Sequence, residues 1–465
     1  MEISFFGAAQ TVTGSQYLLE VNGSRILMEC GFFQGRRQET YERNLHFHFD
    51  PASIDAVLLS HAHIDHSGNL PNLIKSGYSG PIYTTSATAH LANIMLIDSG
   101  HIQESDAQYV NRKRAQRGEP PIEPIYTLED AAHVAHYFQA KPYKQPFLVA
   151  PGVTATLYDA GHILGSAAIL LEIEEHGKRK RLWFSGDIGR RNLPLLRDPV
   201  LPKQADFLMM ECTYGDKPHE DPLLAEQELE QVVLHTVERQ GKVIVPSFAV
   251  GRTQELVYAL HRMIDSGRVP RIPVYVDSPL AVNVSNIYRA HPECFDQETR
   301  QFIQQDPHGA ALGFDLLTYI RSVEESKALN HLKGPMVILS ASGMAETGRI
   351  LHHLKNNIGD PRNTILIVSW QAPHTLGRRL ADREKKVRIF GEPYIRRAEV
   401  ATIGGFSSHA GQTFLLEYAK ATGDTAQEVI LVHGEERQAE ALQDKLHAQG
   451  MEKVLYPGLG TRIEL

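Results

Sequence analysis

The sequence predicts an α/β protein in which a β-rich first part is interrupted by a second part of alternating strands and helices. The chain begins with short strand patterns, and residues 223–368 then alternate between helix and strand patterns. Strand patterns followed by histidines return near the carboxyl end. Alternating strands and helices with short connections indicate βαβ units, and therefore a mainly parallel sheet flanked by helices.

The first part is expected to cover residues 1–212. Residues 2–6 and 16–21 have the pattern of paired strands joined by a turn at Thr13-Gly14, and residues 25–29 form a third strand pattern. The other elements expected here are strands over 56–59, 82–85, 153–157, 168–173, 182–184 and 206–210, and helices over 87–117 and 128–138. We assign no chemistry to the segment that contains the two helices, because its mixed charges are typical of a solvated helical face.

The second part is expected to cover residues 213–388. Its predicted helices are 223–239, 252–265, 280–290 and 346–356, and its predicted strands are 242–246, 273–276, 336–339 and 364–368. Residues 389–465 then complete the first part, with strands over 399–403 and 428–432 and helices over 412–421 and 437–449. The second part is therefore predicted to be inserted into the first.

A cluster of potential metal ligands follows the buried strand pattern at 56–59. It consists of His61, His63, Asp65 and His66. Closely spaced imidazoles with a carboxylate suit Zn²⁺ or a similar divalent metal better than Ca²⁺ or Mg²⁺, which prefer oxygen ligands. A lone histidine is more often an ordinary core or surface residue, but four ligand side chains after one strand predict a metal site. The His-x-His pair can serve one ion and the Asp-His pair a second.

Three further residues at strand ends extend this prediction. His162 lies in a glycine-bounded turn between two strand patterns, where glycines let the backbone approach an ion. Asp187 follows the strand pattern at 182–184, and one carboxylate can bridge two metal ions. A plain Gly-Asp turn would look the same in isolation. Glu29 either orients a ligating histidine or is a solvent-facing acid at a strand end.

Three loops of the second part, at 247–253, 340–349 and 371–379, carry small and basic residues. Backbone N–H groups at such strand-to-helix turns, with nearby arginines, form good phosphate sites. The alternative is ordinary turns with surface arginines. The candidate substrate-binding residues are Ser247, Arg252, Ser342, Arg349, His374, Thr375 and Arg378.

Composition narrows the class of protein. Apolar residues make up 42% and charged residues 22%, as in ordinary globular proteins, and 47 basic against 55 acidic residues give a net charge of −8. A polyanionic substrate must therefore meet a local basic groove. Three dispersed cysteines indicate neither a disulfide framework nor a thiolate zinc site and fit a reducing cytoplasm. The sequence also lacks a secretion-signal pattern and any apolar run of about eighteen residues, so we expect no membrane association.

The order of these motifs resembles that of a known family. His61-x-His63-x-Asp65-His66, His162, Asp187 and His433 resemble the metal motifs of the metallo-β-lactamase fold. Glu211, His409 and His433 resemble the three additional motifs of its β-CASP nucleases. That group includes the endonuclease subunit of the pre-mRNA 3′-end cleavage complex, ribonuclease J and many smaller RNA-processing enzymes. The resemblance covers nearly the whole chain and implies an αββα sandwich with an inserted β-CASP α/β domain.

The resemblance also implies roles for individual residues. His61, His63, His162 and Asp187 would hold one zinc ion, and Asp65, His66, Asp187 and His433 the other. His409 resembles the proposed general acid of the family, and Glu211 the acid that orients it, so that both join Asp65 and Asp187 as candidate catalytic residues. A histidine at the position of His433 is typical of RNA-directed members, whereas DNA-directed members usually carry an aliphatic residue there.

Two positions depart from the family pattern. The first motif usually has aspartate where this chain has Glu29, a difference of one methylene. The common Gly-Thr-Leu-Gly-Arg loop reads His374-Thr375-Leu376-Gly377-Arg378 here. Losing that glycine either restricts the approach of the backbone to a phosphate or adds a contact from His374.

The hypothesis that follows is hydrolysis of single-stranded RNA with two Zn²⁺ ions per chain, in the cytoplasm, by endonucleolytic or exonucleolytic cleavage. The resemblance is also compatible with a homodimer. Three rivals are a hydrolase of a small ester, thioester or lactam, a DNA-directed nuclease, and a catalytically silent RNA-binding subunit. A large inserted domain is hard to explain for a small substrate, and a silent subunit usually lacks metal ligands that this chain retains.

Overall fold

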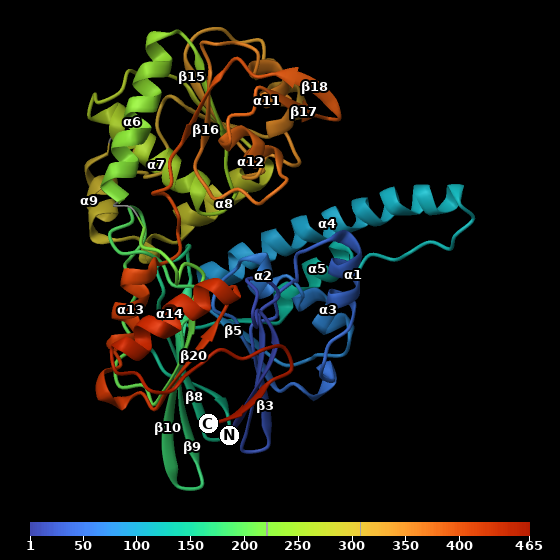
Figure 1. The fold of residues 1–465 in the computed structure, drawn as a ribbon, viewed down its shortest axis with the longest axis vertical. Coiled ribbons are helices and arrows are strands. Elements are labelled where there is room, and N and C mark those ends of the chain that lie inside the picture. The colour runs from blue at the N-terminus through green and yellow to red at the C-terminus, as the bar shows by residue number, and fades with distance from the viewer. Residues whose placement is uncertain (220–221, 307) are drawn as a thin grey trace. The chain divides into compact units, whose positions relative to one another are not determined.

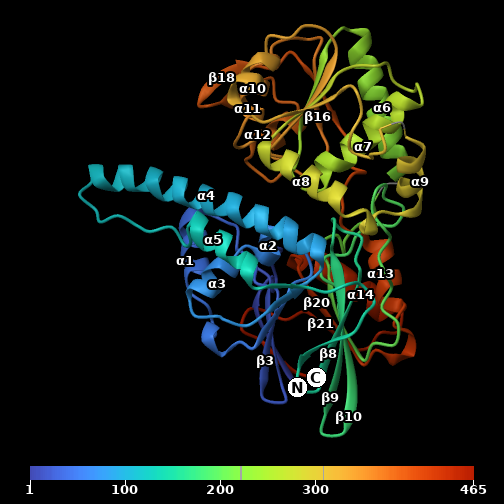
Figure 2. The same ribbon diagram turned by 180° about the vertical axis from the view of Figure 1, so that it is seen from behind.

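The computed structural model describes residues 1–219, 222–306 and 308–465, and its chain folds into two compact units. Unit 1 consists of Met1–Arg191, Asp198–Pro218 and His409–Leu465. Unit 2 consists of Asn192–Arg197 and His219–Ser408. Figures 1 and 2 show both units from opposite sides. The second unit is an insertion within the chain of the first.

Unit 1 contains two sheets of seven strands each. The first sheet has the order β22 (Arg462–Glu464), β1 (Glu2–Gly7), β2 (Gln16–Val21), β3 (Ser24–Met28), β4 (Ala56–Leu58), β5 (Ile82–Thr84) and β6 (Phe138–Ala140). The second has the order β21 (Val454–Leu455), β20 (Glu428–Val432), β11 (Phe207–Glu211), β10 (Lys178–Phe184), β9 (Ala167–Glu175), β8 (Val153–Asp159) and β7 (Phe147–Ala150). Inward-facing side chains of both sheets share one buried core, in which the rings of Tyr17 and Phe184 lie 5.7 Å apart.

Helices cover the outer faces of both sheets. Those on the side of the first sheet are α1 (Arg37–Leu45), α2 (Ile64–Ser67), α3 (Leu70–Lys75), α4 (Ser86–Gln116) and α5 (Leu128–His133), with 3₁₀ turns at Pro51–Ser53 and Val134–His136 (Figure 1). On the other side lie α13 (Gln412–Lys420), α14 (Glu436–Ala448) and a 3₁₀ turn at Gly423–Thr425. Leu415 and Leu442 of these helices pack with Trp183 of β10 in a second core. The layers confirm the predicted αββα sandwich.

Unit 2 is built on one parallel sheet of six strands. Its order is β14 (Leu317–Ile320), β13 (Val274–Asp277), β15 (Met336–Ser340), β12 (Lys242–Pro246), β16 (Thr364–Ile367) and β19 (Glu399–Thr402). The helices are α6 (Pro222–Glu238), α7 (Arg252–Asp265), α8 (Pro279–Ala290), α9 (Gln297–Gln305), α10 (Val323–Leu329), α11 (Ile350–Asn357) and α12 (Leu376–Ala381), with a 3₁₀ turn at Pro292–Cys294 and a hairpin of β17 (Lys386–Ile389) and β18 (Glu392–Ile395). Strands β12, β15 and β16 are buried along their whole length, as expected for a sheet covered on both faces.

Among the expected boundaries that differ from those in the structure, three have an identifiable physical cause. The helix expected over 128–138 ends at His133, because the chain then enters β6 and pairs with β5. The helix expected from residue 346 begins at Ile350, after a loop in which Gly348 adopts a positive φ of 81°. Unit 2 continues to Ser408, past the expected boundary at 388, because β19 pairs with β16 at the edge of its sheet. All three differences depend on pairing or loop geometry between distant residues.

Across the described residues, none of the helices combines the length and the apolar character that a membrane crossing needs. The 31 residues of α4 would be long enough, but this helix carries charged side chains in its carboxyl half.

Candidate metal centre

Loops at the carboxyl ends of strands from both sheets bring the predicted metal ligands together in unit 1. The contributing elements are the end of β4 for His61 and His63, α2 for Asp65 and His66, the β8–β9 turn for His162, the end of β10 for Asp187, and the end of β20 for His433. Gly189 permits the loops of His162 and Asp187 to meet, since a Cβ there would lie 1.9 Å from the carbonyl oxygen of Gly161.

The first ligand group contains His61, His63, His162 and Asp187. His63 Nδ1 lies 3.2 Å from His61 Nε2 and 3.1 Å from His162 Nε2. Asp187 Oδ2 lies 3.5 Å from each of those Nε2 atoms. Three nitrogens and one carboxylate oxygen thus converge on one point.

The second group contains Asp65, His66 and His433. Asp65 Oδ2 lies 3.5 Å from His433 Nε2. The other oxygen of Asp187, Oδ1, lies 3.3 Å from His66 Nε2 and 3.4 Å from His433 Nδ1. Each oxygen of Asp187 therefore faces a different group of histidines.

Glu29 orients two of these histidines, His66 directly and His61 through the hydroxyl of Ser60. It is fully buried, so it is not the solvent-facing acid that the sequence left open. His66 Nδ1–H donates to Glu29 Oε2 at 2.5 Å, and Ser60 Oγ donates to the same oxygen at 2.9 Å. Ser60 Oγ in turn accepts from His61 Nδ1–H at 2.9 Å. In the neutral imidazoles this network assigns the Nδ1–H tautomer to both histidines, and it turns both Nε2 atoms towards the centre. The longer side chain of Glu29 reaches both partners.

Burial keeps the first group of histidines in the neutral form that binds metals. It lowers the pKa of His61 and of His162 well below the ordinary value, and the pKa of His63 to about 4. The carboxylate of Asp187 raises the pKa of these imidazoles but does not outweigh burial. At neutral pH their nitrogens therefore offer lone pairs.

Several buried polar atoms at this centre have no hydrogen-bond partner among the described residues. They include His66 Nε2, Asp187 Oδ1 and His433 Nε2. An unsatisfied buried polar atom costs about 1–3 kcal/mol, so such atoms are rare unless a ligand completes them. Because these atoms belong to imidazoles and carboxylates that face one another, the residues fit a divalent metal ion.

A His–Glu pair adjoins Asp187 Oδ2, the oxygen that faces the first ligand group. His409 Nδ1 lies 3.1 and 3.2 Å from the two oxygens of Glu211 and 3.9 Å from Asp187 Oδ2. The backbone of His409 pairs with Gly189, which fixes it beside the Asp187 loop, and Ile188 N–H donates to Glu211 at 2.6 Å. Burial lowers the pKa of His409, but Glu211 and Asp187 outweigh burial and raise it to about 9. His409 can therefore hold a proton while Nε2 remains available.

The seven expected substrate-binding residues all lie in unit 2, in the loops after β12, β15 and β16 or in the first turn of the helices that follow them. These strands are neighbours, so the loops share one edge of the sheet. Ser247 is buried and hydrogen-bonded to Thr253 at 2.8 Å, whereas Ser342 is partly exposed. Thr375 caps α12 by accepting from the N–H of Arg378 at 3.1 Å. His374 is exposed and has a positive φ of 71°.

Three arginines of these loops, Arg252, Arg349 and Arg378, have carboxylate partners. Arg252 is buried and donates to Glu255 at 2.6 Å, although its Nε lacks a partner among the described residues. The other two pairs are Arg349 with Asp277 at 2.7 Å and Arg378 with Asp382 at 2.6 and 2.9 Å. These arginines organise the loops, and their charge is largely neutralised within unit 2.

Two exposed aromatic side chains at the same edge of the sheet were not among the residues predicted from the sequence. Phe248 is 43% exposed and Trp370 is 57% exposed. The ring of Phe248 rests against Gly343, where a Cβ would lie 2.9 Å from it, and Gln371 donates to the carbonyl of Gly343 at 3.1 Å. Exposed aromatic rings are suited to stacking on nucleobases. Both residues follow closely on the predicted strands β12 and β16, and this position could have identified them as candidates.

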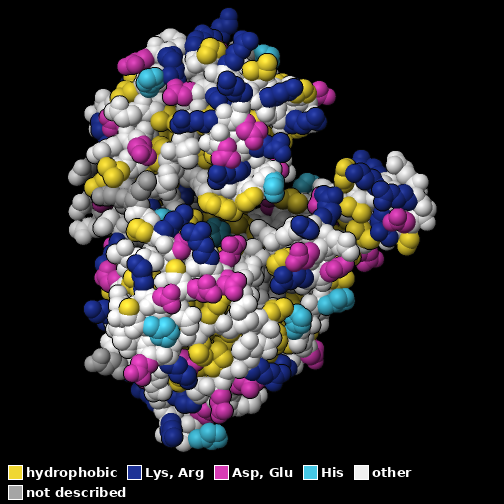
Figure 3. All heavy atoms as spheres, in the orientation of Figure 1, with side chains coloured by type: hydrophobic (Ala, Val, Ile, Leu, Met, Phe, Trp, Pro, Cys, Tyr) yellow, Lys and Arg dark blue, Asp and Glu magenta, His cyan; other side chains and the backbone are white. Residues whose placement is uncertain are grey.

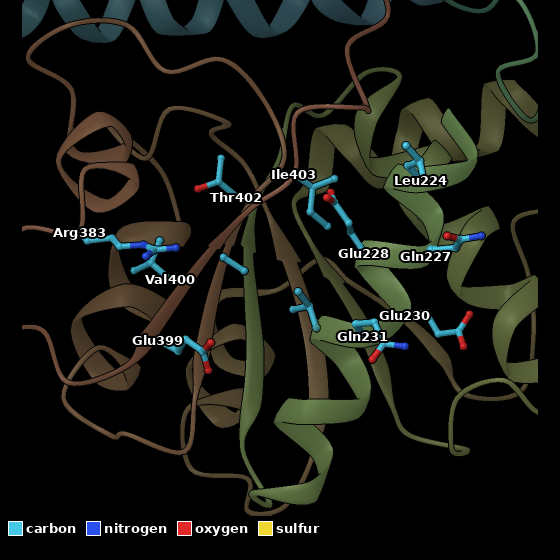
Figure 4. A pocket seen from close by; sticks show the side chains of 12 residues that line it. Leu224, Gln227, Glu228, Glu230, Gln231, Arg383, Glu399, Val400, Thr402 and Ile403 are labelled. Atoms are coloured by element: carbon cyan, nitrogen blue, oxygen red, sulfur yellow. The ribbon is translucent and has the colours of Figure 1, made fainter. Parts of the chain in front are cut away.

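Unit 2 also has a groove between α6 and the edge strand β19. It has a volume of about 680 Å³ and is lined by residues that include Glu228, Glu230, Glu399 and Arg383 (Figure 4). None of the expected site residues lines it. Its excess of carboxylates makes it a poor match for a phosphate.

Family models match three segments of the chain. They are a metallo-beta-lactamase superfamily domain at residues 18–178, a Beta-Casp domain at residues 253–380, and a Zn-dependent metallo-hydrolase RNA specificity domain at residues 394–457. A solved structure of a protein of unknown function from Enterococcus faecalis has the same fold, with a TM-score of 0.58 and 14% identity over 100% of this chain and 99% of the other.

Two relatives match over most of their length. Ribonuclease TTHA0252 from Thermus thermophilus is 39% identical over 453 residues, which cover 97% of each chain. Transcription termination factor FttA from Methanosarcina mazei is 31% identical over 448 residues, which cover 94% of this chain and 67% of that protein. Together with the ligand set, these matches show that the chain belongs to the metallo-β-lactamase superfamily of metal-dependent hydrolases, in the family that carries a β-CASP domain.

Proposed function

We propose that this protein is a ribonuclease that hydrolyses phosphodiester bonds of single-stranded RNA with two zinc ions. The observation that carries the proposal is the position of Asp187 between two ligand groups, with the His409–Glu211 pair beside it. One ligand group would suffice for a single ion. A carboxylate whose two oxygens face separate groups is the arrangement that two-metal hydrolases use.

The distances in the first group support zinc. Ligands of tetrahedral zinc lie about 2.0–2.1 Å from the ion, which places them roughly 3.3 Å from one another. The separations of 3.1–3.5 Å among His61, His63, His162 and Asp187 agree with this value. Nitrogen-rich groups also disfavour Mg²⁺ and Ca²⁺.

When bound, such ions would supply Lewis acidity, which lowers the pKa of water towards about 7 and neutralises charge on a phosphate. Asp65 and Asp187 contribute the negative charge that retains the ions. Glu211 orients His409 through Nδ1, so that Nε2–H can give its proton to the departing ribose oxygen as water attacks phosphorus and the P–O bond breaks. The proton on His409 is consistent with its raised pKa.

RNA is proposed as the substrate on three grounds. The Thermus thermophilus relative is a ribonuclease, and the third matched segment is described as an RNA specificity domain. His433 occupies the position at which the DNA-directed members of the family usually have an aliphatic residue. Cleavage in the cytoplasm, where RNA processing and decay occur, is part of the same proposal.

The loops of unit 2 are proposed to bind the strand through neutral and aromatic groups. Ser342 and His374 offer donors, and Phe248 and Trp370 offer ring faces, whereas the hydroxyl of Thr375 donates to the carbonyl of Ala372 at 2.8 Å and supports the loop. Arg252, Arg349 and Arg378 would support the loops, with only part of their charge available to phosphates.

The proposal is tested with purified full-length protein and an end-labelled single-stranded RNA. Metal content is measured by mass spectrometry before and after dialysis against a chelator, and cleavage is measured in each state. We expect about two zinc ions per chain, loss of cleavage on chelation and recovery on adding zinc. His101→Ala, at an exposed position on α4, serves as a control that removes a histidine outside the centre.

Cleavage that persists in the chelated protein would rule out the metal-dependent reaction. A single-stranded DNA of matching sequence, assayed in parallel, identifies the nucleic acid, and faster cleavage of the DNA would contradict the RNA assignment. Labelling either end of the RNA distinguishes endonucleolytic from exonucleolytic cleavage.

A further inference from the structure

The carboxyl end of α4 extends beyond the core of unit 1. The buried residues of this helix lie between Ala87 and Ala107, and none of residues 108–116 is buried. Figures 1 and 2 both show this end projecting past α1, α3 and α5. These nine residues add about 14 Å of helix that contributes nothing to the core. Packing therefore does not explain the extension.

The projecting end is strongly basic. Residues 108–118, which we call the basic arm, read Gln-Tyr-Val-Asn-Arg-Lys-Arg-Ala-Gln-Arg-Gly and hold four cations and no anion, in a chain with a net charge of −8. Figure 3 shows Lys and Arg side chains gathered at this end. Cations in a last helical turn interact favourably with the helix dipole. A helix that ended near Ala107 would have the same benefit, so the dipole does not account for the arm.

The arm is a folded feature with its own hydrogen bonds. Asn111 donates to the carbonyl of Ile122 and accepts from the N–H of Ile122, both at 2.8 Å. Arg114 donates to the carbonyl of Pro120 at 2.6 Å and pairs with Glu119 at 3.1 Å. These contacts hold the returning segment against the helix. Asn111 and Arg114 are thus used internally, whereas the other three cations of the arm make no ion pair among the described residues.

Three cations of the arm remain exposed. Among the described residues, Arg112, Lys113 and Arg117 have no ion-pair partner. Tyr109 is 43% exposed, and its ring lies 4.5 Å from Lys113 Nζ and 5.6 Å from the guanidinium of Arg37. Arg37 is paired with Asp106 at 3.3 Å, whereas Lys113 has no carboxylate partner among the described residues. An exposed aromatic ring beside such a cation is a surface suited to a nucleic acid strand.

We propose that the basic arm binds the phosphate backbone of single-stranded RNA outside the metal centre. The choice of RNA as the polyanion rests on the proposed function. The opposite end of α4 adjoins the centre, since Thr85 and Thr88 donate to the carbonyl of Gly165 in the turn of His162 at 2.7 and 2.8 Å. A helix of 31 residues is about 46 Å long, which corresponds to roughly 13 stacked nucleotides. Only a long RNA can reach both places.

The test compares the wild-type protein with the variant Arg112→Gln/Lys113→Gln/Arg117→Gln. A matched control, Lys178→Gln/Lys203→Gln/Lys445→Gln, removes the same charge from exposed positions elsewhere in unit 1. Binding of a fluorescent 30-nucleotide RNA is measured by anisotropy with chelator present, at several salt concentrations. Cleavage of a tetranucleotide is measured separately with zinc.

For the arm variant we expect the Kd for the 30-mer to rise about tenfold and the slope of log K against log salt to fall by about 2, since each phosphate contact contributes about 0.7. Its thermal unfolding and its rate on the tetranucleotide stay as in the wild type. Wild-type affinity in the arm variant, or an equal loss in the control, would overturn the proposal. A changed oligomeric state without a change in RNA affinity would also overturn it and assign the arm to protein association. A protein that shows the binding result but cleaves neither RNA would contradict the nuclease function alone.

Discussion

Both units place polar loops at the carboxyl ends of their strands, but the charged side chains in these loops differ in how they are satisfied. In unit 1 the ligand nitrogens and carboxylates face one another, and several lack any other partner. In unit 2 the loop residues Arg252, Arg349 and Arg378 are paired with Glu255, Asp277 and Asp382. The first arrangement leaves buried polar atoms that a bound cation would satisfy, whereas in the second most of the arginine charge is paired within unit 2. The position of a residue at a strand end therefore indicates where a site can form. Whether its polar atoms already have hydrogen-bond or ion-pair partners indicates what kind of ligand the site can bind.

The largest effect is expected from Asp187→Asn, which removes charge from both ligand groups at once. Cleavage should fall by at least about 10³-fold and the zinc content below one ion per chain. Asp444→Asn, at an exposed position on α14, is the control. Retention of two zinc ions by the variant would show that Asp187 is not shared.

His409→Ala should separate proton transfer from metal binding. The turnover number should fall by about 10²–10⁴-fold, while the zinc content stays at the wild-type value. Glu211→Gln, which keeps an acceptor for Ile188 N–H, should lower turnover less. Loss of zinc in His409→Ala would place this histidine among the ligands instead.

Arg252→Met tests whether unit 2 is internally satisfied. Removing one member of a buried pair leaves Glu255 uncompensated, and stability should fall by about 3–5 kcal/mol in calorimetry. Arg252→Met/Glu255→Leu should recover most of this loss. If the double variant regains stability but binds RNA poorly, the unpartnered Nε of Arg252 contacts the substrate.

Trp370 offers a direct optical readout of the loop edge in unit 2. The chain has two tryptophans, and Trp183 is buried and hydrogen-bonded to Tyr418 at 2.7 Å. RNA should therefore quench the fluorescence of Trp183→Phe but not that of Trp370→Phe. Trp370→Ala should weaken RNA binding by about 1–3 kcal/mol, the usual contribution of one stacked base. Equal quenching in both phenylalanine variants would exclude stacking on Trp370.

The smallest effect is expected at His374. Its φ of 71° lies in the left-handed region, which costs a residue with a Cβ about 1–2 kcal/mol. Glycine removes this strain but adds about 0.5–1 kcal/mol of chain entropy, so His374→Gly should stabilise unit 2 by about 0.5–1 kcal/mol. If RNA binding weakens at the same time, the imidazole contributes a contact that offsets its strain.

The sequence alone determined the architecture and the identity of the candidate ligands. Strands such as β12 and β20 are continuous apolar runs, and their pattern is local, so it can be read without a structure. The spacing of His61, His63, Asp65 and His66 is local for the same reason. The sequence did not predict β6, because a strand of three residues depends on pairing with its neighbour in the sheet.

Only the tertiary structure decided how these residues are used. It turned Glu29 from an uncertain strand-end acid into the buried acceptor for His66 and Ser60, because the partners are distant in the sequence. It paired Arg349 with Asp277, which no local pattern predicts. It also showed that α4 extends beyond its last buried residue, whereas the sequence predicted only a solvated helix there. Periodicity and spacing are properties of neighbouring residues, whereas burial and charge pairing arise only when distant segments meet.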